Sequence, residues 1–145
     1  MFYGAHEHSI DRKGRLIIPA KFRELCKEHL VETLYVTRGL DGCLFLFTEE
    51  EWRLLENRFK SVSFTRAEGR QFNRLFFSGA CDVAPDAQGR ILIPRDLKEY
   101  AQLRQNVMVV GVSNRVEVWA QERWKHFTSQ TLPQFESVAE KFLGE

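Results

Sequence analysis

The sequence contains few cysteines, and their number and spacing argue against two common ways of holding a small fold together. Only three occur among 145 residues, namely Cys26, Cys43 and Cys81. An odd count without a C-x-x-C pair favours neither a disulfide framework nor a zinc site. We interpret all three as small buried thiols in a reducing compartment, and we expect neither a metal nor a cofactor.

Long apolar runs are also missing. No stretch approaches the roughly 20 apolar residues of a membrane-spanning helix. The first residues do not show the charged and then apolar layout of a secretion signal. We therefore expect a cytoplasmic protein without a membrane partner.

Familiar catalytic motifs are absent as well. The sequence has no G-x-x-x-x-G-K-S/T phosphate loop, no G-x-S-x-G nucleophile turn, no H-E-x-x-H and no G-x-G-x-x-G. His6 and His8 could share one face of a strand, but no acidic residue or cysteine at a suitable spacing completes a metal site. We predict that the chain is not an enzyme and has no small-molecule substrate.

The net charge of +1 is too small to indicate a nucleic-acid partner by itself. The cations are nevertheless segregated. Residues 12–23 contain five Lys or Arg and no acid, and residues 58–74 contain five against Glu68 alone. Such a chain can present a basic face, although a solvated surface is the simpler interpretation of composition alone.

What the sequence does contain is a stretch that occurs twice. Residues 11–19 read D-R-K-G-R-L-I-I-P, and residues 86–94 read D-A-Q-G-R-I-L-I-P. Asp, Gly, Arg and Pro recur at the same spacing, and an apolar trio precedes each Pro. The chain is 43% hydrophobic and has 12 phenylalanines, which is ample for a packed core.

Each copy of the motif predicts a tight turn followed by a short strand. The glycine, Gly14 or Gly89, can adopt the positive φ that such a turn needs. The aspartate, Asp11 or Asp86, opens the turn and can pair with the arginine four residues later. The proline then ends the strand and suits the first position of a helix. We assign these four residues to shaping the turns.

The repetition extends beyond the motif. Gly4-Ala5 corresponds to Gly79-Ala80, and Gly39, Leu44, Phe47 and Trp52 correspond in order to Gly111, Val116, Trp119 and Trp124. Short repeats bury their apolar faces against one another, and no Pro/Gly/Ser-rich linker separates these copies. We therefore predict one pseudo-symmetric body rather than two separate domains.

The same order of elements is expected in both copies. In the first we predict a strand over 1–10, a short strand after the turn, a helix over 20–30 and a hairpin of 34–37 with 43–47. In the second we predict strands over 77–84 and 90–93, a helix from Pro94 and a hairpin of 107–110 with 116–119.

Helices are expected between and after the copies. Thr48 to Glu51 and Thr65 to Glu68 have the spacing of capping boxes and predict two helix starts. The second helix carries Phe72, Leu75 and Phe76 at helical spacing, which favours core packing over base stacking. Aromatic residues beyond Trp124 belong to C-terminal helices, one of which is expected to begin at Pro133.

The first turn carries charges that a turn does not require. Arg12 and Lys13 occupy its exposed positions, and with Arg15 they place three cations at one rigid tip. Such a tip suits phosphate contacts and a guanidinium fork directed at guanine. The second tip is uncharged at both positions, so only Arg90 keeps its charge there. From the residues alone, a DNA-binding tip and a plain structural hairpin are equally good interpretations.

The turn–strand–proline unit and its duplication closely resemble the MraZ family of bacterial transcriptional regulators, whose members contain two AbrB-like (SpoVT-AbrB) repeats. The resemblance is carried by Met1-Phe2-Tyr3-Gly4 and by residues 11–19 and 86–94, which match the two D-x-x-x-R motifs of that family. Residues 111–124 also resemble the end of its second repeat. The similarity covers nearly the whole chain.

The resemblance implies an α+β fold in which tandem swapped-hairpin β-barrel repeats form one pseudo-symmetric core, with helices after each repeat. The expected boundaries are 5–47 for repeat 1, 48–75 for a helical connector, 76–119 for repeat 2 and 120–145 for C-terminal helices.

The resemblance also implies a nucleoid-associated, sequence-specific DNA-binding regulator of the division and cell-wall gene cluster. It would bind repeated boxes upstream of its own gene as a ring-shaped homo-oligomer, so double-stranded DNA and further copies of the chain are the expected partners. The expected DNA contacts are Arg15 first, with Arg12 and Lys13 beside it, and then Arg90, Lys21 and Arg23. The alternative is a ring-forming protein interaction module without sequence-specific DNA binding.

Overall fold

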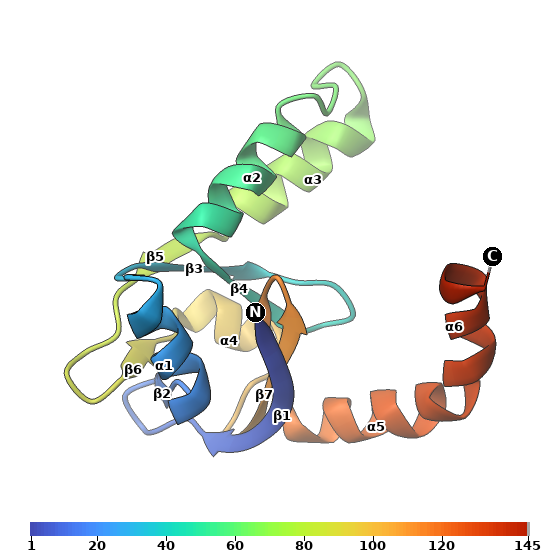
Figure 1. The fold of residues 1–145 in the computed structure, drawn as a ribbon. Coiled ribbons are helices and arrows are strands. Elements are labelled where there is room, and N and C mark those ends of the chain that lie inside the picture. Colours follow the sequence, from blue (N-terminus) through green and yellow to red (C-terminus); the bar gives the residue numbers. More distant parts are fainter. Residues whose placement is uncertain (145) are drawn as a thin grey trace.

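Strands and helices alternate along the chain as the repeated sequence pattern predicts. The computed structural model describes residues 1–144 (Figure 1). Its strands are β1 Phe2–Ser9, β2 Arg15–Ile17, β3 Leu34–Arg38, β4 Leu44–Thr48, β5 Cys81–Val83, β6 Arg90–Leu92, β7 Asn106–Ser113 and β8 Val116–Ala120. Its helices are α1 Ala20–Glu28, α2 Glu49–Phe59, α3 Ala67–Ser78, α4 Arg95–Tyr100, α5 Gln121–Thr131, the 3-10 turn η1 Leu132–Gln134 and α6 Phe135–Leu143. The fold is therefore α+β.

The main sheet is built symmetrically from both copies of the repeat. Its six strands follow the order β1-β7-β8-β4-β3-β5, and all their pairings are antiparallel. The counterparts in the two copies are β1 and β5, β3 and β7, and β4 and β8. Exchanging the members of each pair gives the same strand order read from the opposite edge of the sheet. The first strand of each copy thus pairs with the hairpin of the other copy, which an arrangement of two independent domains would not produce.

The two short strands that follow the motif turns form a separate ribbon. Within residues 1–144, β2 pairs antiparallel with β6, with Leu16 opposite Ile91 at the centre, and Leu16 also forms an isolated antiparallel bridge with Ile10. The β-barrel closure implied by the resemblance stays a prediction, because the strand pairing within residues 1–144 forms one open sheet and this ribbon.

One hydrophobic core joins the two copies. The central cluster takes Leu16, Phe22 and Val36 from the first copy, and Ile91 and Val109 from the second. All five side chains are buried, and the ring of Phe22 from α1 meets Phe2 edge-on at 5.3 Å between ring centres. Burial on this scale is the main stabilising contribution to such a fold. The prediction of one fused body is thereby confirmed.

The expectation that all three cysteines are buried is correct only for Cys43, because Cys26 and Cys81 are half-buried.

The helical hairpin α2–α3 follows the first copy and stands away from the sheet (Figure 1). Its inner face is aromatic, because Trp52 stacks on Phe76 and Phe59 meets Phe72 and Phe76 edge-on. The predicted cap at Thr48 is present, since its hydroxyl accepts a hydrogen bond from the amide of Glu51 at 3.3 Å.

Three expectations about α3 and the following strand are wrong. The helix begins at Ala67 with Arg66 at its N-cap, and the Thr65 hydroxyl bonds the Ser63 hydroxyl instead of capping. The helix continues to Ser78, so the strand predicted over 77–84 shrinks to β5. The expected core stripe is buried only at Phe76, while 59% of Leu75 is exposed.

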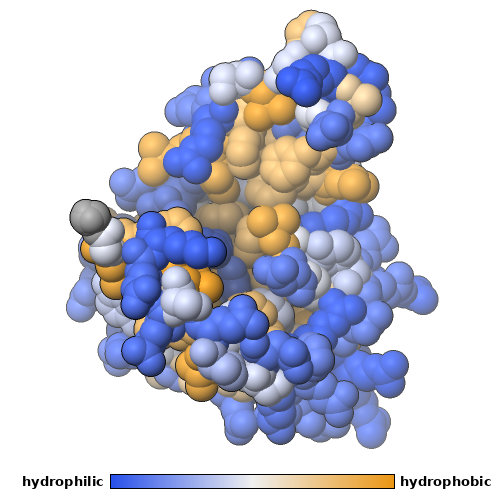
Figure 2. Space-filling view, turned by 90° about the vertical axis from the view of Figure 1, so that its right-hand side faces the viewer, coloured by the Kyte–Doolittle hydropathy of each residue, from blue (hydrophilic) through white to orange (hydrophobic). Residues whose placement is uncertain are grey.

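The C-terminal segment extends from the sheet as an arm made of α5, η1 and α6 (Figure 1). Pro133 lies inside η1, and α6 begins at Phe135, slightly later than predicted. Apolar side chains lie open on this arm and on the α2–α3 hairpin, as the orange surface in Figure 2 shows. The most exposed of them are Leu54, Phe64, Leu75, Leu132, Phe135, Phe142 and Leu143.

None of the helices in residues 1–144 combines the length and apolar character needed to cross a membrane.

Candidate nucleic-acid interface

The first motif folds into a turn that is held by the side chain of Asp11. One carboxylate oxygen accepts the amides of Lys13 and Arg15, each at 2.9 Å, and the other accepts Nε–H of Arg15 at 2.7 Å. Gly14 closes the turn with φ +85° and donates its amide to the Asp11 carbonyl at 3.0 Å. Arg12 and Lys13 are exposed at the tip.

The second motif repeats this geometry with other residues at the tip. Asp86 accepts the amides of Gln88 and Arg90 at 2.9 Å each, and Nε–H of Arg90 at 2.8 Å. Gly89 has φ +77°. Ala87 and Gln88 are exposed where the first tip has its two cations.

These hydrogen bonds favour the ionised form of both aspartates. The pKa of Asp11 lies below its ordinary value of 3.8, chiefly because the Arg15 amide donates to the carboxylate. The pKa of Asp86 is lowered in the same way by the amide of Arg90. Both carboxylates are therefore charged at neutral pH, and each remains available to orient its arginine.

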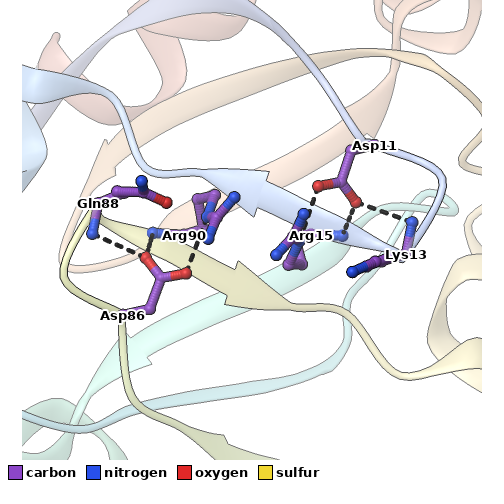
Figure 3. Close-up of polar contacts among 6 residues, drawn as sticks. All are labelled: Asp11, Lys13, Arg15, Asp86, Gln88 and Arg90. Atoms are coloured by element: carbon purple, nitrogen blue, oxygen red, sulfur yellow. Dashed lines mark hydrogen bonds and ion pairs between the residues drawn. The ribbon is translucent and has the colours of Figure 1, made fainter.

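The turns lie at opposite ends of the β2–β6 ribbon (Figure 3). The Gly14 carbonyl accepts the amide of Ile93 at 2.9 Å, and the Gly89 carbonyl accepts the amide of Ile18 at 2.9 Å. Each tip is thus tied to the strand of the other copy. The two arginines lie between the tips, in an arrangement related by an approximate twofold axis.

Both motif arginines keep most of their hydrogen-bonding capacity. Asp11 and Asp86 bind the Nε edges, and within residues 1–144 the terminal nitrogens of Arg15 and Arg90 have no hydrogen-bond partner. About a third of the Arg15 side chain is exposed (30%), and a similar share of Arg90 (26%). The predicted pairing of each aspartate with the arginine four residues later is present. It leaves the forked end of each guanidinium open to solvent.

A cation from the opposite copy stands beside each tip. Arg23 of α1 lies against Gly89, with its Nε 3.0 Å from the point where a side chain there would begin. Lys98 of α4 has its Nζ 3.8 Å from the equivalent point at Gly14. Arg23 is also held by a hydrogen bond from its Nε to the Ile18 carbonyl at 2.9 Å. The second tip therefore gains a positive charge that its own loop lacks.

The sequence analysis did not select Lys98 as a candidate contact, although Lys98 occupies the position in the second copy that Arg23 occupies in the first. Arg23 is the fourth residue after Pro19, and Lys98 is the fourth residue after Pro94. That spacing does not indicate that each of these cations lies beside the turn of the other copy. Lys21 lies exposed on the first turn of α1, near Arg23 in sequence.

The second basic segment, residues 58–74, lies elsewhere. It belongs to the α2–α3 hairpin, which Figure 1 shows projecting from the sheet away from the ribbon. Arg70 there donates to the Phe64 carbonyl at 3.0 Å. The structure thus brings the residues of 12–23 together with the second motif, but not those of 58–74.

The two N-terminal histidines lie in β1, and one of them packs against α1. The ring of His6 meets Phe22 edge-on at 5.1 Å between ring centres. Burial lowers the pKa of His8 below 6.5, and the neighbouring His6 and Arg23 add to this shift. No cluster of three or more potential metal ligands occurs in the part of the chain that the structure describes.

These features define a class of protein: a tandem-repeat α+β fold whose two copies share strands and present paired Asp–Arg turns on one basic ribbon. Comparison with known proteins specifies it further. A family model described as "MraZ protein, putative antitoxin-like" matches residues 1–75 and again residues 76–144. The chain belongs to this family.

Close relatives cover nearly the whole chain. The protein named Transcriptional regulator MraZ from Pelotomaculum thermopropionicum is 50% identical over 143 residues, which is 99% of this chain and 96% of the relative. The protein of the same name from Heliobacterium modesticaldum is 48% identical, over 99% of this chain and 97% of the relative. The one from Acetivibrio thermocellus is 50% identical over 141 residues, covering 97% and 96%.

Proposed function

We propose that this protein is a sequence-specific DNA-binding transcriptional regulator that contacts the duplex with the β2–β6 ribbon and its two tips. The names of its relatives support the regulatory role. The observation that carries the proposal is the pair of guanidinium groups, Arg15 and Arg90, held open on one exposed ribbon. The major groove of B-DNA is wide enough to admit a two-stranded β-ribbon.

Each residue has a distinct part in this proposal. Arg15 and Arg90 read base edges, because a guanidinium oriented by a carboxylate loses little freedom on binding and can make two bonds to guanine. Arg12 and Lys13 contact phosphates from the first tip. Arg23 and Lys98 add phosphate contacts beside the two tips, and Lys21 extends the basic surface along α1.

The finer role follows from the resemblance of the sequence to its family. We propose that the protein acts at the nucleoid on the division and cell-wall gene cluster, through repeated boxes upstream of its own gene. Several boxes require several ribbons held together. A ring-shaped homo-oligomer would supply them and would raise the effective concentration of each ribbon near its box.

Open apolar surface supports self-association. Phe135, Val138 and Phe142 recur on one face of α6 with 62%, 42% and 83% of their surface exposed. A helix with an apolar face normally packs against another element. In a ring, that face would pack against a second copy of the chain.

The alternative is a ring-forming protein interaction module that does not bind specific DNA, and the same apolar surface is its main support. The two functions differ in their response to salt. Binding through phosphates weakens steeply as salt rises, whereas an apolar protein interface does not.

The experiment is Arg15→Ala, with the exposed Arg58→Ala on α2 as a control that removes an equal charge far from the ribbon. We expect Arg15→Ala to abolish specific binding to DNA from upstream of the gene, because a lost bidentate contact costs about 1–3 kcal/mol in each copy. The control should bind like the wild-type protein. Unchanged affinity in a folded Arg15→Ala variant would refute the proposal.

A further inference from the structure

Each end of the ribbon exposes one apolar side chain, beside the buried central pair of Leu16 and Ile91. Ile17 and Leu92 have 41% and 57% of their surface open, whereas their neighbours Leu16 and Ile91 are buried at 0% and 1%. Alternate residues of a strand point to opposite faces. The ribbon therefore has a core face, which carries Leu16 and Ile91, and a solvent face.

The solvent face combines these apolar residues with the motif arginines. Leu92 lies directly opposite Arg15, and Ile17 lies directly opposite Arg90. Alternation places Arg15 with Ile17 on one strand and Arg90 with Leu92 on the other. Each arginine thus has an apolar side chain as its cross-strand neighbour, in a pattern that repeats across the approximate twofold axis.

The surroundings restrict what can cover this face. Arg12, Lys13 and Lys98 lie around one end of the ribbon, and Arg23 lies at the other. A second ribbon of the same kind would bring these cations together and would be repelled. An anionic partner that also offers apolar groups between its charges fits both features.

Duplex DNA is such a partner, and its major groove has one apolar group, the C5 methyl of thymine. Resting on the proposed DNA-binding function, we propose that Ile17 and Leu92 are specificity-determining residues that contact thymine methyl groups. Neighbouring strands lie about 4.8 Å apart, so each apolar side chain reaches the base pair that its arginine partner reads or the next one. The preferred site would then place a thymine beside each contacted guanine, as an inverted pair.

The test begins with a random pool of duplexes, from which the wild-type protein selects its preferred sequence. The selected duplex is then made with deoxyuridine in place of each required thymidine, which removes only the methyl group. We expect the wild-type protein to lose about fourfold in affinity for each contacted methyl removed.

The same comparison is made with the double variant Ile17→Ala and Leu92→Ala, and with the control Leu40→Ala, an apolar residue that is 66% exposed in the β3–β4 turn. The double variant should bind the thymidine duplex more weakly and should no longer distinguish it from the deoxyuridine duplex. The control should distinguish the two as the wild-type protein does.

The outcomes separate this inference from the function on which it rests. Selection of a sequence whose affinity for the wild-type protein is unaffected by deoxyuridine overturns the inference and leaves specific DNA binding standing. Equal methyl sensitivity in the wild-type protein and the double variant also overturns it. A pool without any enriched sequence overturns both. The wild-type comparison needs no variant, so an affinity that is unaffected by deoxyuridine overturns the inference even if the double variant misfolds.

Discussion

At the scale of single residues, the two motif aspartates fix the orientation of the motif arginines and, within residues 1–144, leave their terminal nitrogens free to bind a partner. Asp11 and Asp86 each engage the Nε edge of an arginine and two backbone amides of the turn. The same carboxylate therefore shapes the loop and orients the guanidinium. A lysine at Arg15 or Arg90 could keep the charge but would lose the planar fork and its two parallel bonds.

The motif glycines give the first prediction. Gly14→Val and Gly89→Val should both lower the melting temperature, because a left-handed conformation costs an ordinary residue roughly 1–2 kcal/mol and a β-branched one more. Gly89→Val should also displace Arg23, which fills the space beside Gly89. Thermal unfolding followed by circular dichroism measures the effect. Melting at the wild-type temperature would show that the turn does not depend on these glycines.

At the scale of elements, the ribbon is the part of the fold that brings the candidate site residues together. β2 and β6 are short, with three residues each, and neither has another strand partner within residues 1–144. Their pairing places both tips, both arginines and the cations of α1 and α4 on one continuous surface. Each copy alone would supply only half of it.

The unequal tips give the second prediction. Replacing Arg12 and Lys13 by Ala should reduce the slope of log affinity against log salt by roughly two units, about one for each lost phosphate contact. Arg23→Ala should reduce it by about one unit, because this cation serves the second tip. Changing Ala87 and Gln88 to Ser removes no charge and should leave the slope unchanged. A first-tip variant with the wild-type slope would mean that the basic tip is only a solvated turn.

Local patterns predicted the elements well but not their extent. The Asp–Gly–Arg spacing correctly indicated the turns, and Thr48 correctly indicated the start of α2. The prediction failed around α3, because the tertiary contacts of Trp52 and Phe59 with Phe77 draw that residue into the helix. Within residues 77–84, the pairing with β3 is confined to Cys81–Val83.

The candidate site was predictable only within one copy of the repeat. The residues of the first tip could be proposed from their charges, since they follow one another in sequence. The approach of Arg23 to Gly89 and of Lys98 to Gly14 depends on strands exchanged between copies. Contacts of this kind join distant parts of the chain, and no local spacing encodes them.

At the scale of the whole molecule, a symmetric sheet carries asymmetric surroundings. After the first copy, α2 and α3 pack together and return the chain to the sheet. After the second copy, α5 and α6 form an arm whose outer helix has its aromatic residues open to solvent (Figure 1). This open α6 face is the surface through which we propose that the protein self-associates.

The exposed arm gives the third prediction. Phe135→Ser together with Phe142→Ser should reduce the mass of the assembly measured by light scattering after size-exclusion chromatography, because the apolar contact between copies is lost. Secondary structure should not change, since both side chains are exposed. Leu40→Ser removes another largely exposed apolar side chain elsewhere and should keep the assembly intact. An unchanged mass in the double variant would exclude α6 from the interface.

The most direct measurement compares the affinity of the wild-type protein for two duplexes of equal length at one salt concentration. One duplex contains the sequence upstream of the gene, and the other is random. Specific regulators bind their sites about a thousandfold or more tightly than other DNA, and we predict a difference of this order that falls sharply in Arg15→Ala. Equal affinity for both duplexes would contradict the account and would favour the protein interaction module.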